Sequence, residues 1–87
     1  MQFNFSSVVI TDLAGNAVPK VHEALANGIY TATKDLSLVE TARAIYRGES
    51  VELSQTQLEE VKRIIEDEKV GFMAFVRDAY LTFIKTA

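Results

Sequence analysis

Residues 70–84 (VGFMAFVRDAYLTFI) constrain the fold of this chain more than any other stretch. They include three of the five phenylalanines of the sequence. If the stretch is helical, at about 100° per residue, its large apolar side chains cover well over half of the helix circumference. Only Asp78, Thr82 and Lys85 then form a polar wedge. Because a surface helix normally has a narrower apolar stripe, we expect this helix to pack on several sides.

The same stretch suggests an association surface. Its apolar arc is wider than the inward faces of the other predicted helices, and an exposed apolar patch usually marks an interface. We therefore expect a homodimer, with an alternative in which the strand and the other helices wrap the final helix completely. The residues assigned to this interaction surface are Phe72, Phe75, Val76, Tyr80, Phe83 and Ile84.

Composition limits the class of protein. The chain has 87 residues, which fits one domain spanning residues 1–87. It has no cysteine, which excludes disulfides and thiolate chemistry, and its net charge of −3 gives no electrostatic reason to expect nucleic acid or an anionic membrane as a partner. No apolar run approaches the ~20 residues of a membrane span, and the N-terminus lacks the positive region of a signal peptide. We expect a soluble intracellular protein.

The N-terminal part has the only clear strand signal. Residues 3–11 alternate in part between two faces and end in the β-branched run Val8, Val9, Ile10, Thr11, so we predict a strand there. The turn-forming sequence DLAGNAVP follows. Residues 17–18 then form either a short return strand, which makes a hairpin, or part of a plain loop before a helix.

Four helices are predicted after this turn, at residues 20–32, 38–47, 55–68 and in the final stretch. Gly28 lies on the inward face of the first, where it either permits close approach of another element or breaks the helix. Ser37 and Asp35 compete to cap the second helix, and Gly48 suits its left-handed end. Ser54 with Gln57 forms a capping box for the third. The fold class is α+β and mainly helical, with a small N-terminal strand or hairpin packed on about four helices.

Residues that could carry chemistry are few. His22 is the only histidine, and the adjacent Glu23 points about 100° away from it on a helix. No ligand spacing indicates a metal, no motif indicates a cofactor, and no serine or cysteine stands in a nucleophile context. We therefore assign no catalytic, cofactor-binding or metal-binding residue, and we expect that the protein is not an enzyme.

Three other polar features have ordinary structural explanations. Asp12 and its neighbours resemble a hairpin turn more than a phosphate-binding or cation-binding loop. The acidic run at residues 66–68 is flanked by basic residues and fits a solvated helix face better than a mimic of nucleic-acid phosphates. Tyr46 and Arg47 are too few for a nucleic-acid contact, and a cation is favourable in the last turn of a helix.

Three segments carry a resemblance to a known group of proteins: MQFNF at the start, DLAGNAVP after it, and AIYRGESVELSQTQLEEVKRIIE. Together they resemble small uncharacterised proteins of bacteriophages and prophages, over about residues 1–68. The resemblance implies the cytoplasm of a bacterial host and a role in binding proteins, and it supplies no catalytic motif. We expect a non-enzymatic protein–protein interaction module that binds a host or virion protein. The alternative is a nucleic-acid-associated accessory protein, such as a DNA mimic or a regulator.

Overall fold

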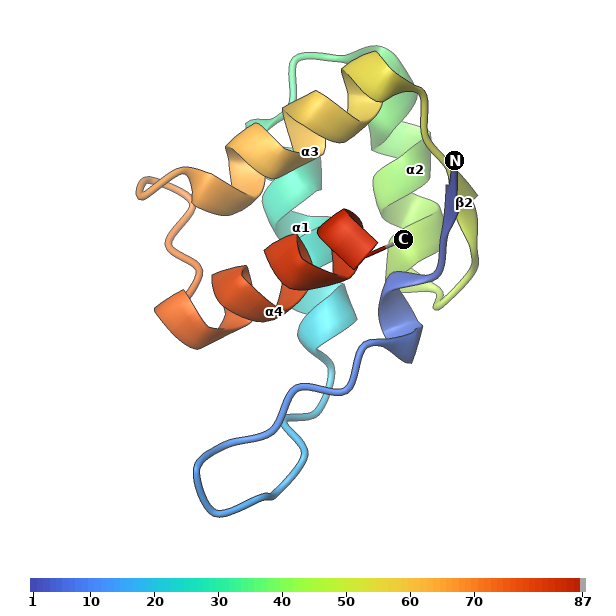
Figure 1. The fold of residues 1–87 in the computed structure, drawn as a ribbon. Helices are drawn as coiled ribbons and strands as arrows, with labels where there is room; N and C mark the ends of the chain where they lie inside the picture. Colours follow the sequence, from blue (N-terminus) through green and yellow to red (C-terminus); the bar gives the residue numbers. More distant parts are fainter. Residues whose placement is uncertain (87) are drawn as a thin grey trace.

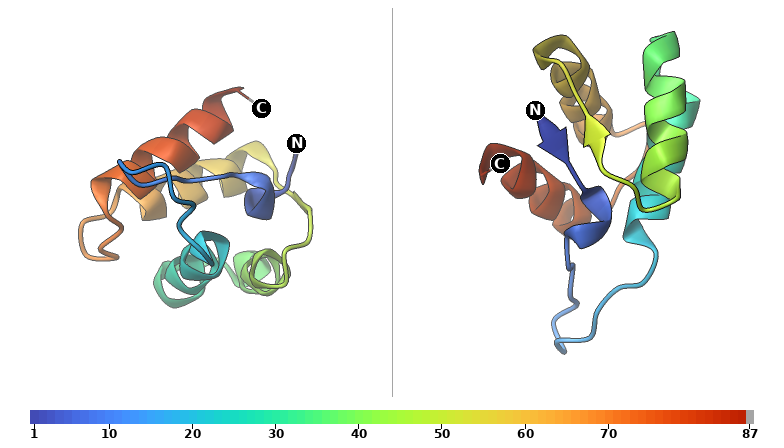
Figure 2. Two further views of the ribbon diagram at one scale, coloured as in Figure 1. Left: turned by 90° about the horizontal axis from the view of Figure 1, so that it is seen from below. Right: turned by 90° about the vertical axis from the view of Figure 1, so that its right-hand side faces the viewer.

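The computed structural model describes residues 1–86 and has the predicted mainly helical α+β fold. The helices and strands are β1 (Gln2–Phe3), the 3₁₀ turn η1 (Phe5–Ser7), α1 (Val21–Ala32), α2 (Leu36–Tyr46), β2 (Val51–Glu52), α3 (Gln55–Glu66) and α4 (Ala74–Thr86). The N-terminus lies beside β2 (Figure 1). The helices form two layers, α1 with α2 and α3 with α4, and the N-terminal segment enters along the side between them (Figure 2).

Helices α1 and α2 form a hairpin whose inner faces are apolar. Asp35, and not Ser37, caps α2, because its Oδ1 accepts the backbone N–H of Ser37 at 2.9 Å. The helix therefore begins at Leu36, two residues before the predicted start. The Ser37 hydroxyl instead accepts a hydrogen bond from Gln57 at 2.8 Å, which ties the start of α2 to α3. Gly48 has the expected positive φ of 81° after α2.

Helix α3 begins with the predicted capping box. The Ser54 hydroxyl accepts the backbone N–H of Gln57 at 3.2 Å, and the Gln57 side chain accepts the N–H of Ser54 at 2.9 Å. Leu53 and Leu58, the two positions of a hydrophobic staple, are both buried. The direction in which the chain enters α3 is thus set both by the hydrogen bonds of the capping box and by the burial of the two leucines.

Helix α4 is shorter than the apolar sequence suggested. It begins at Ala74, because residues 68–71 form a turn in which Gly71 adopts a φ of 83°. Phe72 follows this turn and packs over Gly28 of α1, where an added Cβ would lie 2.5 Å from the Cζ atom of Phe72. Gly28 therefore permits close approach of another element and does not break the helix.

The prediction of a continuous strand at residues 3–11 is wrong. Only Gln2–Phe3 is a strand, and it pairs antiparallel with Val51–Glu52. Asn4 then redirects the chain, because its side chain accepts the N–H of Ser6 at 3.0 Å and starts the turn η1. The β-branched residues that follow lead into a hairpin, in which Thr11 pairs antiparallel with Ala17.

A cluster of four aromatic rings joins the two ends of the chain. Phe5 lies at the centre, with ring centroids 5.7 Å from Phe3, 6.0 Å from Tyr80 and 5.6 Å from Phe83. Phe3 and Phe5 are only 2% and 1% exposed. The N-terminal segment thereby covers a flank of α4 that α3 leaves open.

We predict that Ser54→Ala lowers the free energy of unfolding by about 1 kcal/mol, because the substitution removes the N-cap acceptor of α3. Urea denaturation of the wild type and the variant measures the difference. The matched control is Ser50→Ala, since Ser50 is exposed and precedes β2. Equal losses in both variants would contradict the assigned cap.

A second prediction concerns the contact between Gly28 and Phe72. In a Phe72→Ala background, Gly28→Ala should raise the free energy of unfolding by up to about 1 kcal/mol, because alanine is the better helix former. With Phe72 present, the new Cβ must displace the ring, so the gain should shrink or reverse. A double-mutant cycle measured by urea denaturation tests this coupling, and additive effects would contradict it.

Candidate functional site

The residues expected to form an interaction surface lie in different environments. Val76, Tyr80 and Ile84 are 9%, 1% and 5% exposed and belong to the core. Phe83 is half-buried in the aromatic cluster, 6.0 Å from the ring of Phe3. The assignment of Val76, Tyr80 and Ile84 to an interaction surface is therefore corrected, because these side chains are buried within one chain. The flanks of α4 are covered by α3 and by the N-terminal segment.

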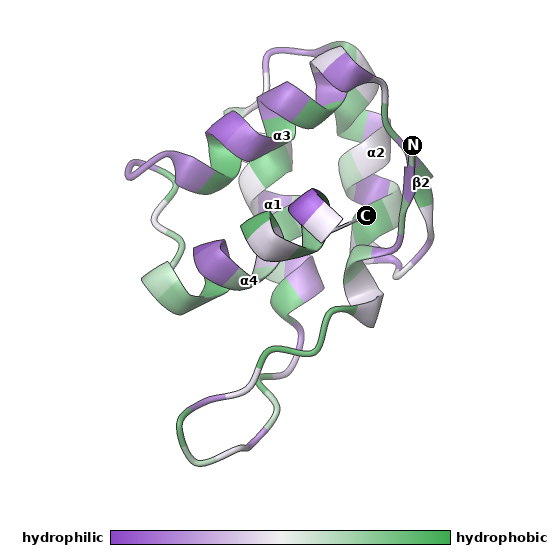
Figure 3. Ribbon diagram, in the orientation of Figure 1, coloured by the Kyte–Doolittle hydropathy of each residue, from purple (hydrophilic) through white to green (hydrophobic). Residues whose placement is uncertain are grey.

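The start of α4 keeps apolar side chains in solvent. Phe75 is 44% exposed and Met73 is 69% exposed, and the fully exposed Leu13 comes from the tip of the hairpin. We call these three residues the Phe75 patch. A cleft of about 540 Å³ lies between the hairpin and α4, lined by Thr11, Asp12, Leu13 and Phe75. Figure 3 shows hydrophobic residues on both the hairpin and the first turn of α4.

A second cleft extends the Phe75 patch towards α1. Its volume is about 270 Å³, and Phe75 and Met73 line it together with Pro19 and the half-buried Phe72. The two clefts share Phe75, which therefore stands between them. Of the six residues assigned to the surface, Phe72, Phe75 and Val76 line this cleft, although Val76 is almost fully buried.

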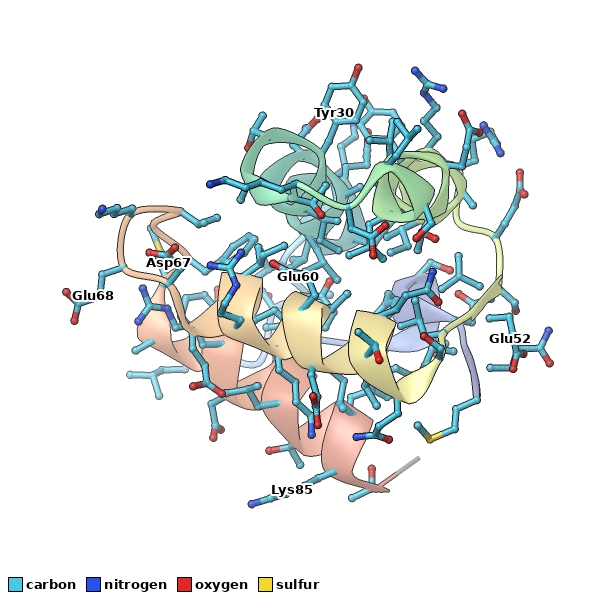
Figure 4. The ribbon with its side chains drawn as sticks, turned by 90° about the horizontal axis from the view of Figure 1, so that it is seen from above. Tyr30, Glu52, Glu60, Asp67, Glu68 and Lys85 are labelled. Carbon is cyan, nitrogen blue, oxygen red and sulfur yellow. The ribbon has the colours of Figure 1, made fainter. Side chains whose placement is uncertain are left out.

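A shallow groove between α1 and α2 was not predicted from the sequence. Tyr30 and Tyr46 form its walls and the buried Ala26 and Ala42 lie beneath them, with a volume of about 250 Å³. Figure 4 shows Tyr30 on the outer side of the α1–α2 layer. The signal in the sequence was that Tyr30 projects away from the apolar stripe of its helix.

The charges around this groove are largely satisfied. The Arg43 guanidinium lies 5.9 Å from the centre of the Tyr30 ring and forms an ion pair with Glu40. A hydrogen bond to Glu23 and the charge of its carboxylate raise the pKa of Tyr46. The groove therefore offers aromatic faces more than free charge.

Two of the polar residues discussed in the sequence analysis, Asp12 and Arg47, have structural roles. Asp12 closes the hairpin turn, because its Oδ1 accepts the N–H groups of Ala14 and Asn16, each at 2.9 Å. Arg47 donates a hydrogen bond to Glu49 at 2.6 Å at the end of α2, and this interaction lowers the pKa of Glu49.

The acidic run at the end of α3 lies against basic groups. Asp67 is 3.8 Å from Arg63, and its Oδ1 accepts the N–H of Lys69 at 2.9 Å. Glu68 points outward from the α3–α4 loop (Figure 4). His22 is partly exposed in the first turn of α1, and residues 1–86 contain no cluster of three or more histidine, aspartate or glutamate side chains that could hold a metal ion.

Tyr80 carries a polar atom without a partner. Its hydroxyl is buried and makes no hydrogen bond within the described part of the chain. Burial raises the pKa of Tyr80 from its ordinary value of 10.0 to about 12. The ring contacts Phe5 edge-on and lies in the core, so this phenol supports packing and is not a surface group.

No known family model matches the sequence, and neither a curated protein nor a solved structure matches the chain. The resemblance to phage proteins thus stays a prediction. Among the described residues, none of the helices has the length and apolar character needed to cross a membrane.

We predict that Tyr80→Phe leaves the protein at least as stable as the wild type at pH 7, because the substitution removes a buried hydroxyl without a partner. The pKa of Tyr80 is raised in the folded state, so the stability linked to its protonation is complete below pH 10.0 and is lost as the pH rises towards 12. Tyr80→Phe should therefore lose less stability than the wild type in this range.

Denaturation at a series of pH values measures this difference. The control is Tyr30→Phe, since the Tyr30 side chain is 49% exposed. This control should keep the wild-type dependence on pH. A Tyr80→Phe protein that is clearly less stable at pH 7 would show that the hydroxyl has a partner in solution.

Proposed function

We propose that this chain is a non-enzymatic, phage-encoded protein–protein interaction module that binds a host or virion protein in the bacterial cytoplasm. The observation that carries the proposal is the Phe75 patch. Three large exposed apolar side chains from two separate segments line neighbouring clefts of about 540 and 270 Å³, and Phe75 lines both. Exposed apolar clusters of this kind serve as protein contacts more often than single scattered residues do.

The energetics favour covering this patch. Burying a large apolar side chain contributes roughly 1.5–3 kcal/mol, so two or three such residues could anchor a partner. Aromatic residues and methionine are enriched at protein interfaces. The core of α4 beneath the patch is well packed, since Val76 and Tyr80 are buried, and this gives the exposed side chains a rigid base.

The arrangement of charge gives less support to the nucleic-acid alternative. Arg43, Arg47 and Arg63 each pair with a glutamate of the same chain, and the net charge is −3. Phosphate binding needs basic groups that are free to replace counterions. A protein partner that recognises apolar surface fits these observations better.

We predict that Phe75→Ser abolishes capture of a specific partner when the tagged protein is used as bait in a bacterial lysate. The matched control is Leu36→Ser, because Leu36 is 83% exposed but lies at the start of α2, outside the patch. Both variants should melt like the wild type.

Two results would contradict the proposal. One is a partner that Phe75→Ser retains as well as the wild type does. The other is binding to generic DNA with an affinity that falls steeply as salt is raised, which would favour the nucleic-acid-associated role.

A further inference from the structure

The hairpin at residues 10–18 has an open backbone edge. The N–H of Val18 donates to the carbonyl of Ile10 at 2.8 Å, and the N–H of Asp12 donates to the carbonyl of Asn16 at 3.0 Å. Thr11 lies between these bonds, opposite Ala17, so its own N–H and carbonyl point away from the hairpin. Alternation along an extended chain places the backbone groups of Val9 on the same outer edge. Neither residue has a backbone hydrogen bond within residues 1–86.

The opposite edge of the hairpin is closed to pairing. Ala17 faces outward there, but the next outward position is Pro19, which has no N–H to donate. Lys20 then adopts a left-handed conformation with a φ of 59°, which ends the extended chain. The hairpin therefore offers only the edge of Val9 and Thr11 to another strand.

The open edge lacks the usual protection against pairing. Charged side chains, proline or a bulge normally block an exposed edge. Here residues 2–11 contain no charged side chain, and Val9 is 75% exposed. Ile10 is 5% exposed and anchors the strand to the core, while the hairpin itself projects beyond the helices (Figure 1).

We propose that a second copy of this chain pairs along this edge. In an antiparallel arrangement about a two-fold axis at Ile10, Val9 of each copy lies opposite Thr11 of the other. Each of the two residues donates its backbone N–H to the carbonyl of the other. The two hairpins thereby become one four-stranded sheet. This inference rests on the proposed protein-binding function. It identifies a second copy of the chain as the partner that binds the hairpin side of the Phe75 patch.

The second copy fits this edge for three reasons. The outward donors and acceptors of Val9 and Thr11 are complementary to those of the same two residues after a two-fold rotation. No like charges meet along the paired segment, although the whole chain carries a net charge of −3. The cleft lined by Thr11, Leu13 and Phe75 lies directly beside the edge, so pairing also brings apolar surface together.

Sedimentation equilibrium at micromolar concentration tests the proposal with variants of Thr11. Thr11→Pro removes the outward N–H but spares the hairpin, whose own donors are Asp12 and Val18. The wild type and the conservative Thr11→Val, which keeps the N–H, should be dimers. Thr11→Pro should be a monomer, with a dimer dissociation constant raised at least about tenfold. A thermal melt of each protein checks that it is folded.

A charge-swap experiment at Val9 decides the matter if Thr11→Pro fails to fold. In the proposed register the two Val9 side chains are diagonal neighbours on one face, about 7–8 Å apart. Val9→Lys and Val9→Glu should each be monomers alone, and an equimolar mixture should form a mixed dimer. Dimers in both single variants, or no dimer in the mixture, would overturn the proposal.

The remaining outcomes separate this inference from the proposed function. A wild type that stays monomeric at these concentrations overturns the dimer, as does a Thr11→Pro protein that is folded and dimeric. The proposal is also overturned if the wild type is a monomer that captures a foreign partner and the Thr11→Pro variant does not capture it. That result would show that a strand of the foreign partner pairs with this edge. In each case, capture by the wild type and its loss in Phe75→Ser would still support the protein-binding function.

Discussion

The packing of Phe5 against Tyr80 and Phe83 is the interaction on which the rest of this structure depends. It brings the first residues of the chain onto the last helix, with ring centroids 6.0 and 5.6 Å apart. Aromatic pairs of this geometry contribute about 0.5–1.5 kcal/mol each beyond the burial of their surface. The short pairing of β1 with β2 adds only a few hydrogen bonds. The aromatic contacts therefore contribute much of the free energy that keeps the N-terminal segment packed on α4.

This closure determines where apolar surface remains exposed. The N-terminal segment covers the second half of α4, around Tyr80 and Phe83, and α3 packs against the same helix. The first turn of α4 has no such cover, so Phe75 stays partly exposed beside the hairpin. One long apolar sequence is thus divided into a buried half, which stabilises the fold, and an exposed start, which is available for binding.

Local signals in the sequence predicted the helices well. The capping box depends only on Ser54 and Gln57, which are three residues apart in the chain, and the role of Gly48 depends only on its own positive φ. The prediction of a strand at residues 3–11 was wrong because Phe3 and Phe5 both reach the core through a turn set by Asn4, and not through regular alternation, while Val9 stays exposed. Periodicity alone does not reveal such a turn.

The candidate site was only partly predictable, for a related reason. Phe72 and Phe75 were assigned to a surface because of their residue type, but which apolar residues remain exposed depends on contacts between segments far apart in the sequence. Phe3 meets Phe83 across the whole length of the chain, and Leu13 reaches the neighbourhood of Phe75 from the hairpin. Sequence periodicity gives the width of the apolar arc and not the elements that cover it.

The hairpin is the least embedded part of the described chain, and this bears on its role. Between residues 8 and 18 only Ile10 is buried, whereas every helix contributes at least three buried residues. Segments with few buried contacts open most easily. The projecting hairpin, with the exposed apolar residues Val9 and Leu13, therefore contributes little to the stability of the single chain. An extended arm of this kind gains stability when its free edge and its apolar side chains contact another chain. The weak anchoring of the hairpin and the exposure of the Phe75 patch therefore point to the same end of the molecule as the place where binding energy is available.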